Sequence, residues 1–205
     1  MSMSLMARPT LWLRPFLLSG LLATACVLPG CASLQAPSVA NTAAGSAVQD
    51  YDGRFAVRYE QNGEIKNAYG NFAWRQRGDA VTLQLLNPLG QTQAIVYSTP
   101  GEAKLELPNR APLTGPRLEQ VMRDALGFAL PVAGLRYWLQ LEAAPNTHGT
   151  LTRDPQTGRI TQLQQDGWTI DYLSYTDTQP AHIKRVNLSR EVNGEPLQVK
   201  LVLDN

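Results

Sequence analysis

Apolar and polar side chains alternate along most of the chain beyond residue 50, which is the pattern of β-strands with one buried face. Phe55, Val57 and Tyr59 show the alternation, and the Asn62-Gly63 pair after them favours a tight hairpin. Gly70 interrupts the return strand and predicts a β-bulge there. Further alternating segments are separated by turn residues and lie at 69–74, 81–85, 95–97, 105–107, 160–163, 168–172, 182–188 and 197–203. Many short strands joined by turns predict a curled antiparallel sheet in one domain.

The pattern changes to a helical one between residues 115 and 139, where apolar residues recur every three or four positions. Gly115 and Pro116 predict the start of a first helix and Gly127 its end, and a second helix is expected from Pro131. The apolar positions of the two helices include Leu118, Val121, Met122, Leu135 and Trp138. We expect this helical insertion to fill or cover the concave side of the sheet.

The amino terminus has the features of an export signal. A basic segment containing Arg8 precedes an apolar segment at 11–27, which Arg14 and Pro15 interrupt. The uninterrupted apolar stretch from Phe16 to Leu28 is too short to cross a bilayer comfortably. We therefore assign residues 1–30 to a signal peptide.

The signal ends in Leu28-Pro29-Gly30-Cys31, which resembles the lipobox of bacterial lipoproteins. In that class the cysteine becomes the first residue of the mature protein and carries the acyl chains, so we expect lipidation at Cys31. Cys26 is a rival site, although Ala23 replaces the usual leucine upstream of it, and a disulfide between the two cysteines is a further alternative. Ala32 follows Cys31, and resemblance to bacterial sorting signals then implies the outer membrane as destination.

Residues 31–49 contain mostly Ala, Ser, Asn and Thr, which predicts a lipidated start followed by a flexible tether. The remaining residues, 50–205, are expected to form one domain. The whole chain has 18 basic and 17 acidic side chains, and removal of Arg8 and Arg14 leaves 16 basic ones. This balance predicts no nucleic-acid partner.

The expected domain is poor in groups that perform chemistry. Its histidines, His148 and His182, are far apart in sequence, and it has no Gly-x-Ser-x-Gly motif and no glycine-rich phosphate loop. Asp166 precedes Gly167, which is better explained by a turn than by a catalytic carboxylate. We therefore expect neither enzymatic activity nor a metal or cofactor, and infer that a curled apolar sheet tied to a membrane binds an apolar ligand.

Several segments, taken in order, resemble the outer-membrane lipoprotein receptors of the LolB family. They are YDGRFAVRYE, NFAWRQ, LQLLNPLG, LPVAGLRYWL and QDGWTIDYLSY, from about Tyr51 to Tyr175, with a looser match through the last strands. The resemblance implies an unclosed antiparallel half-barrel of about eleven strands, with helices forming a lid over a hydrophobic cavity. It also implies a periplasm-facing monomer that accepts triacylated lipoproteins from the carrier LolA and inserts them into outer-membrane lipid.

The resemblance assigns roles to particular residues. The turn Asn87-Pro88-Leu89-Gly90 carries a large aliphatic residue at its tip, and the local sequence leaves open whether Leu89 packs into the core or faces solvent. The family implies an exposed leucine here, flanked by Pro88 and Gly90, that helps to release cargo into the membrane. The helical residues Leu118, Val121, Met122, Leu135 and Trp138 are lid candidates. The cavity candidates, for which the sequence leaves open the strand face that is concave, are Phe55, Phe72, Trp74, Leu83, Leu85, Trp168, Ile170 and Tyr172.

An alternative function is a structural or assembly lipoprotein that binds another outer-membrane protein. That function predicts apolar residues on an exposed sheet edge rather than around a cavity. The sequence leaves this alternative open, together with the cargo preference and the geometry of transfer from LolA.

Overall fold

The computed structural model describes residues 48–115, 118–192 and 194–204. The predicted signal peptide and both candidate lipidation sites, Cys31 and Cys26, lie outside the described residues, as does most of the predicted tether. The first strand begins at Val48, so the last two residues of the segment expected to be tether, 48 and 49, belong to the sheet.

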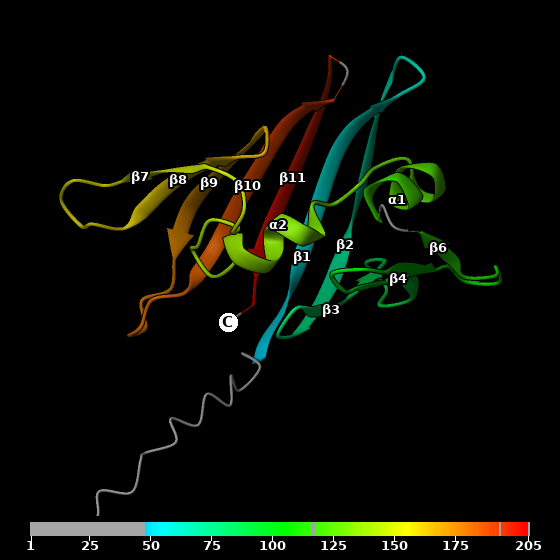
Figure 1. Cartoon of the computed structure of the whole chain (residues 1–205), viewed down its shortest axis with the longest axis horizontal. Coiled ribbons are helices and arrows are strands. Elements are labelled where there is room, and N and C mark those ends of the chain that lie inside the picture. Colours follow the sequence, from blue (N-terminus) through cyan, green and yellow to red (C-terminus); the bar gives the residue numbers. More distant parts are fainter. Residues whose placement is uncertain (1–47, 116–117, 193, 205) are drawn as a thin grey trace, which may run out of the picture. The chain divides into compact units, whose positions relative to one another are not determined.

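Eleven strands form one antiparallel sheet in the order β6-β5-β4-β3-β2-β1-β11-β10-β9-β8-β7 (Figure 1). The strands at the two ends of this order are not paired with each other, so the prediction of an unclosed antiparallel half-barrel is confirmed. The strands are β1 (Val48–Gln61), β2 (Glu64–Arg77), β3 (Ala80–Leu86), β4 (Thr92–Ser98), β5 (Ala103–Glu106), β6 (Leu113–Gly115), β7 (Gly149–Arg153), β8 (Ile160–Gln165), β9 (Trp168–Tyr175), β10 (Ile183–Val192) and β11 (Glu195–Leu203).

The first and last strands meet at the centre of the sheet. β1 pairs with β11 from Gly53 opposite Leu203 to Arg58 opposite Gln198. The other neighbouring strands of the described sheet are consecutive in the chain. The sheet therefore consists of two halves, β1–β6 and β7–β11, and the segment that connects them contains the helices.

Gly70 of β2 leaves room for groups of the two adjacent strands, β1 and β3, to approach closely. The register of β1 and β2 is continuous, so the bulge predicted at Gly70 is wrong. A Cβ atom at this position would lie 2.0 Å from the carbonyl oxygen of Leu86 and 3.2 Å from the ring of Phe55. Gly70 lies opposite Phe55, and Gly53 lies opposite Phe72. Each aromatic ring thus lies across from a glycine on the adjacent strand, an arrangement that supports a strongly curled sheet.

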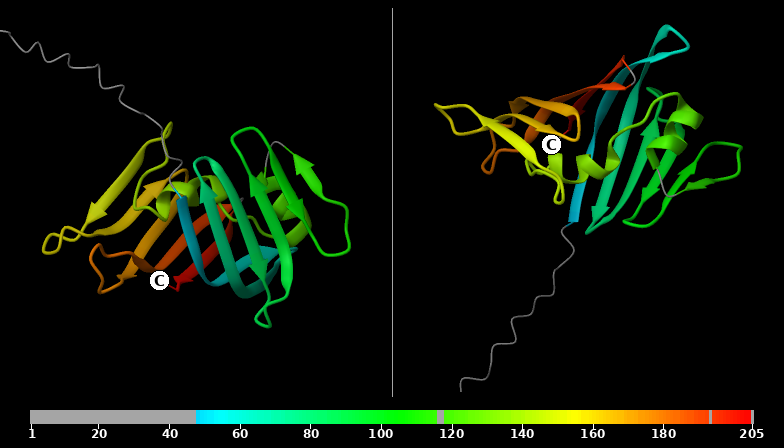
Figure 2. Two further views of the ribbon diagram at one scale, coloured as in Figure 1. Left: turned by 90° about the horizontal axis from the view of Figure 1, so that it is seen from below. Right: turned by 45° about the horizontal axis from the view of Figure 1, so that its top comes forward.

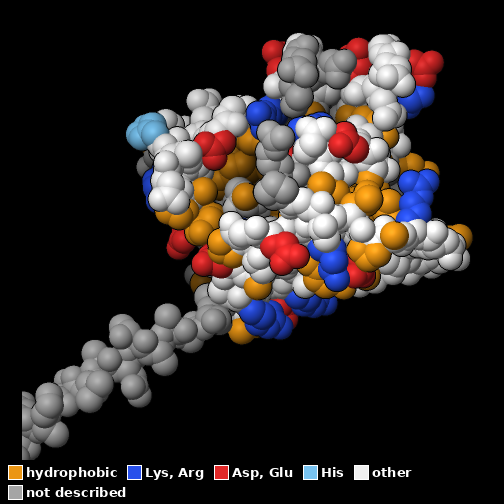
Figure 3. Space-filling view, turned by 45° about the vertical axis from the view of Figure 1, so that its right-hand side comes forward, with side chains coloured by type: hydrophobic (Ala, Val, Ile, Leu, Met, Phe, Trp, Pro, Cys, Tyr) orange, Lys and Arg blue, Asp and Glu red, His pale blue; other side chains and the backbone are white. Residues whose placement is uncertain are grey.

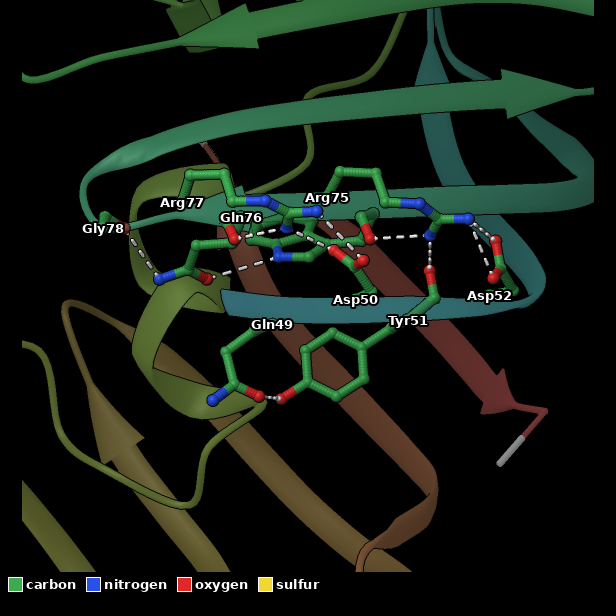
Figure 4. Close-up of polar contacts among 9 residues, drawn as sticks. Gln49, Asp50, Tyr51, Asp52, Arg75, Gln76, Arg77 and Gly78 are labelled. Atoms are coloured by element: carbon green, nitrogen blue, oxygen red, sulfur yellow. Dashed lines mark hydrogen bonds and ion pairs between the residues drawn. The ribbon is translucent and has the colours of Figure 1, made fainter. Parts of the chain in front are cut away.

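Charged and aromatic residues alternate where β1 begins (Figure 4). Arg77 donates to Asp50 at 2.6 and 3.1 Å, and Arg75 donates to Asp52 at 2.8 and 2.9 Å. Tyr51, between the two aspartates, is part-buried and packs against the core. Exposed ion pairs of this kind add little stability individually. The alternation does determine which face of β1 is buried.

The two predicted helices are present, as α1 (Leu118–Leu126) and α2 (Val132–Trp138), but Gly115, predicted to mark the start of the first helix, is instead the last residue of β6. They lie across the concave side of the curled sheet (Figure 2). Helix α1 is followed by Gly127, whose φ of 82° is the left-handed conformation expected after a helix, and Pro131 precedes α2. Within the described residues, neither helix has the length and apolar character needed to cross a membrane.

Candidate functional site

All the predicted cavity residues of the sheet lie on one face, the face that the helices cover. Cross-strand pairing places Trp74 opposite Leu83 and Phe72 opposite Leu85 on this face. Strand alternation and pairing place the remaining ones there too, and none is more than 8% exposed: Phe55, Phe72, Trp74, Leu83, Leu85, Trp168, Ile170 and Tyr172. The sequence did not determine which strand face is concave, and in the structure all eight candidates lie on the same, helix-covered face.

The predicted lid residues face this side of the sheet. Met122 of α1 and both Leu135 and Trp138 of α2 are buried. Leu118 and Val121 are half-buried and pack against the same apolar core. The structure thus brings the cavity and lid candidates together between the sheet and the two helices.

Trp138 attaches α2 to the sheet by two hydrogen bonds. Its indole Nε1 donates to Oε1 of Gln165 at 2.8 Å, and its carbonyl oxygen accepts from the hydroxyl of Tyr172 at 2.9 Å. Burial raises the pKa of Tyr172 further above neutral, which favours the protonated hydroxyl that donates this bond. The Trp138 ring lies 6.3 Å from that of Trp168, and a Cβ atom at Gly134 would approach it to 2.4 Å. Glycine at 134 therefore permits the ring to fold back against its own helix.

Gln165 is a buried polar residue that the sequence analysis missed. It is 3% exposed and also accepts from the backbone N–H of Ala144 at 2.8 Å. Its amide nitrogen donates to the carbonyl oxygens of Ala144 and Thr147 at 2.8 and 3.1 Å. This one side chain thus connects β8 to the lid and to the segment after it. A single glutamine in a polar stretch of a strand provides no local signal of such a role.

A pocket of about 400 Å³ lies between α1, α2 and the turn that joins β4 to β5. Arg136 of α2 lines it and is only 7% exposed, and it donates from Nη2 to the hydroxyl of Ser98 at 3.3 Å. Neither residue is predicted from the sequence, although Arg136 stands out as a charged residue next to Leu135 in a short apolar helical segment. Of the predicted lid and cavity residues, Leu118 lines this pocket.

Comparison with known proteins identifies the family. A family model described as "Outer membrane lipoprotein LolB" matches residues 49–205. "Outer-membrane lipoprotein LolB" of Cupriavidus metallidurans is 42% identical over 189 residues, which cover 89% of this chain and 92% of the relative. The protein of the same name from Bordetella pertussis is 40% identical over 196 residues, which cover 95% of this chain and 94% of the relative.

This chain belongs to the LolB family. Among solved structures, the LolA superfamily protein NE2245 from Nitrosomonas europaea aligns with a TM-score of 0.43 and 10% identity. The alignment covers 77% of this chain and 87% of that chain, and a likeness this distant carries no argument. The family assignment therefore depends on sequence, and the fold assignment on the structure itself.

In this LolB-family chain, the loop between β3 and β4 holds Leu89 in solvent. Leu89 is 85% exposed. Asn87 gives the loop its shape, because its side-chain oxygen accepts from the backbone N–H groups of Leu89 and Gln91, both at 2.9 Å. Its carbonyl oxygen accepts from the N–H of Gly90, which has a φ of 83°. Pro88 completes an exposed tip. Of the two interpretations that the local sequence left open, the structure shows the exposed leucine.

One face of this LolB-family domain mixes both signs of charge. On the face drawn in Figure 3, Lys and Arg side chains lie among Asp and Glu side chains, with apolar patches between them. In the described part of the chain, no group of three or more His, Cys, Asp or Glu side chains could hold a metal ion. The features that distinguish the described domain are the covered apolar face, the pocket beside Arg136 and the exposed leucine.

Proposed function

We propose that this protein is an outer-membrane receptor that accepts lipoproteins from the soluble periplasmic carrier LolA and inserts them into the membrane. The observation that carries the proposal is the continuous apolar face of the curled sheet, covered by two short helices. Membership in the LolB family, whose curated members are named outer-membrane lipoproteins, supports the location. Binding of acyl chains is sufficient for this function, and we assign no catalytic step or cofactor to it.

Burial of acyl chains explains why such a receptor is needed. A triacylated lipoprotein carries about 45 methylene groups, and burial of each is worth about 0.8 kcal/mol. The product of roughly 36 kcal/mol is an upper bound because the chains also cluster in water. Passage of the free lipoprotein through an aqueous compartment is therefore negligible. A series of acceptors that bury the chains successively better moves the cargo without chemical fuel.

Acceptance of cargo requires the helices to move. The residues between the sheet and the helices are nearly inaccessible to solvent, and protein interiors are close-packed. Acyl chains can therefore replace these contacts only when the lid is displaced. Helix α1 contacts β5 and β6, near one edge of the sheet, whereas α2 is bonded to the sheet through Trp138. We expect α1 to move first and α2 to act as the hinge side of the lid.

The membrane contacts are assigned to two separate places. The lipid on Cys31 is the anchor, and residues 31–47 are the tether. Val48 pairs with Arg77 at the end of β2, and Arg77 pairs with Ala80 at the start of β3. Strand β3 runs away from Val48, so Leu89, in the loop after β3, lies beyond the end of the strand that is farther from Val48. A chain from Cys31 to Val48 spans at most about 60 Å. That reach exceeds the roughly 20 Å length of β3, so a lipid-anchored monomer can turn the Leu89 loop towards the bilayer.

Transfer of labelled cargo tests the proposal. The full-length protein is reconstituted into liposomes and mixed with LolA that carries a fluorescent triacylated lipoprotein. We expect the label to move from the LolA fraction to the liposomes at a rate that rises with receptor density. Equal movement into liposomes without the receptor would refute the proposed function.

Leu89→Glu separates acceptance from insertion. Insertion of one leucine side chain into the lipid interface is worth about 1–2 kcal/mol, enough to orient the domain but not to anchor it. Because Leu89 is exposed, its replacement should change the free energy of unfolding by less than about 0.5 kcal/mol. We expect the variant to take cargo from LolA and retain it.

Leu173→Glu is the matched control, since Leu173 is also exposed, at 57%, but lies on β9. It should insert cargo at the wild-type rate. Loss of acceptance or of folding in Leu89→Glu would contradict the assigned role. Equal loss of insertion in both variants would indicate a general effect of added negative charge.

A further inference from the structure

Arg136 is a buried cation without a counter-ion among the described residues. Its single side-chain hydrogen bond is the long one to Ser98, and its Nε has no hydrogen-bond partner in the described part of the chain. None of the ion pairs between described residues includes it. A guanidinium has five N–H donors, and its burial without acceptors is strongly unfavourable. An acceptor that enters the pocket would remove this penalty.

The pocket around Arg136 combines polar and apolar walls. Arg123 and Glu119 of α1 line it and lie 3.9 Å apart, and Glu102 lines it from the β4–β5 turn. Its two arginines and two glutamates balance in charge. The rest of the wall includes the apolar side chains of Pro100, Ala103, Leu118, Val132 and Ala133. Val132 and Leu118 also belong to or pack against the core beneath the helices, so the pocket adjoins the apolar interior.

This combination selects the chemistry of the occupant. A phosphate group would face Glu102 and Glu119 as well as the arginines, which disfavours a doubly charged anion. Neutral carbonyl oxygens accept hydrogen bonds from a guanidinium without that repulsion. Ser98 accepts from Arg136, so its own hydroxyl proton is available for a second acceptor. Ester carbonyls that carry long alkyl chains match both the donors and the apolar walls.

We propose that Arg136 and Ser98 bind the ester carbonyl oxygens of a diacylglyceryl group, whose acyl chains enter the apolar space beneath α1 and α2. The inference rests on the proposed function and adds to it a polar recognition site. The two polar side chains position the glyceryl end of the lipid at the side of the lid, which burial of the acyl chains alone would not do. The same diacylglyceryl chemistry occurs in triacylated lipoproteins and in glycerophospholipids.

Matched ester and ether probes test the proposal with the full-length protein. The first pair is a fluorescent tripalmitoyl-S-glyceryl-cysteine peptide and its analogue with two ether-linked alkyl chains, which lacks the glyceryl carbonyls. A hydrogen bond from a charged donor corresponds to about a 10-fold to 100-fold difference in affinity. We expect the wild type to prefer the ester probe by at least about 10-fold. In Arg136→Met the ester probe should lose most of its advantage over the ether probe, whose binding should be unchanged.

The second pair is a diester and a diether phosphatidylethanolamine. Selectivity in either pair supports the site, and the pair that shows it identifies the source of the diacylglyceryl group. Equal binding of ester and ether probes by the wild type in both pairs would overturn the proposal, as would full selectivity in Arg136→Met. If the wild type binds neither probe of either pair, it is the proposed function that fails.

Three further variants keep the test independent of folding. Thermal melting should show Arg136→Met to be at least as stable as the wild type, since an unpaired buried charge is replaced by an apolar side chain. If it unfolds instead, Ser98→Ala serves as the test variant and should reduce the ester preference severalfold. Arg136→Lys should restore part of the preference that Arg136→Met loses. Glu102→Gln, from the same pocket, should leave the ester preference intact. If Glu102→Gln lost the ester preference, Arg136 would be positioned by Glu102 rather than by the ligand.

Discussion

Replacement of Gln165 by alanine should destabilise the domain strongly, because this side chain satisfies several groups around the lid. Its removal leaves the indole N–H of Trp138 and the backbone N–H of Ala144 without their acceptor. The indole N–H is buried and the Ala144 N–H is part-buried. A buried donor left unpaired costs about 1–3 kcal/mol, so we expect a loss of about 3 kcal/mol in the free energy of unfolding. For a domain of this size that corresponds to a fall in Tm of roughly 10 °C.

The adjacent residue is a matched control. Gln164 is exposed on the opposite face of β8, and among the described residues its side chain bonds only to the half-buried side chain of Gln162. Gln164→Ala should change stability by less than about 0.5 kcal/mol. Urea unfolding of both variants, followed by circular dichroism and by tryptophan fluorescence, measures the difference. A loss in Gln165→Ala no larger than that in Gln164→Ala would refute the reasoning.

A double-mutant cycle isolates the bond to the lid. Trp138→Phe removes the indole N–H, and in combination with Gln165→Ala it should show a coupling of about 1–2 kcal/mol. Additive effects of the two substitutions would mean that the bond between Trp138 and Gln165 adds no stability. In that case α2 would be held by packing and by the hydroxyl of Tyr172 alone.

Two other substitutions follow from the structure. Gly70→Ala should lower the free energy of unfolding by about 2 kcal/mol or more, because the new methyl group collides with the backbone carbonyl of Leu86. Urea denaturation measures this change, and an unchanged midpoint would show that the sheet accommodates the methyl group without cost. The hydrogen bond from Arg77 holds the pKa of Asp50 below its ordinary value, so its contribution is present above about pH 4 and is lost as the pH falls through the folded-state pKa. Asp50→Asn should therefore lower Tm slightly at pH 7 and by less at pH 2.5, and an equal Tm difference at the two pH values would contradict this assignment.

Alternation and turn chemistry predicted the strands well because both are local properties. The Asn62-Gly63 and Asp166-Gly167 pairs adopt the left-handed conformations of tight turns, with φ between 53° and 76°. The strand face of each cavity candidate follows from the same alternation once the pairing is known. Gly70 shows the limit, since a glycine that relieves a long-range contact looks in sequence like one that marks a bulge. Strand β7 was missed because its side chains are mostly exposed and polar, so it has little alternation.

The polar residues of the interior could not be predicted. Arg136 and Gln165 are each defined by partners or pockets formed by distant parts of the chain, such as Ser98 for Arg136. Leu89 was different, because its turn is built by residues next to it, and only its orientation needed the structure. Local sequence therefore predicts the turn that carries Leu89, whereas exposure of its side chain was implied only by the family resemblance, and the partners of the buried polar residues were not predicted at all.

The pairing of β1 with β11 has a consequence for how the chain folds. Each half of the sheet can form from hairpins between strands adjacent in the chain, but the two halves join only when the last strand meets the first. Contacts of such long sequence separation form late, because a long loop must close before they are gained. Until then β1 and β11 each expose an unpaired edge, which is prone to aggregation. The completed central pair should therefore be the slow step of folding, and a chain arrested before it should associate with other copies.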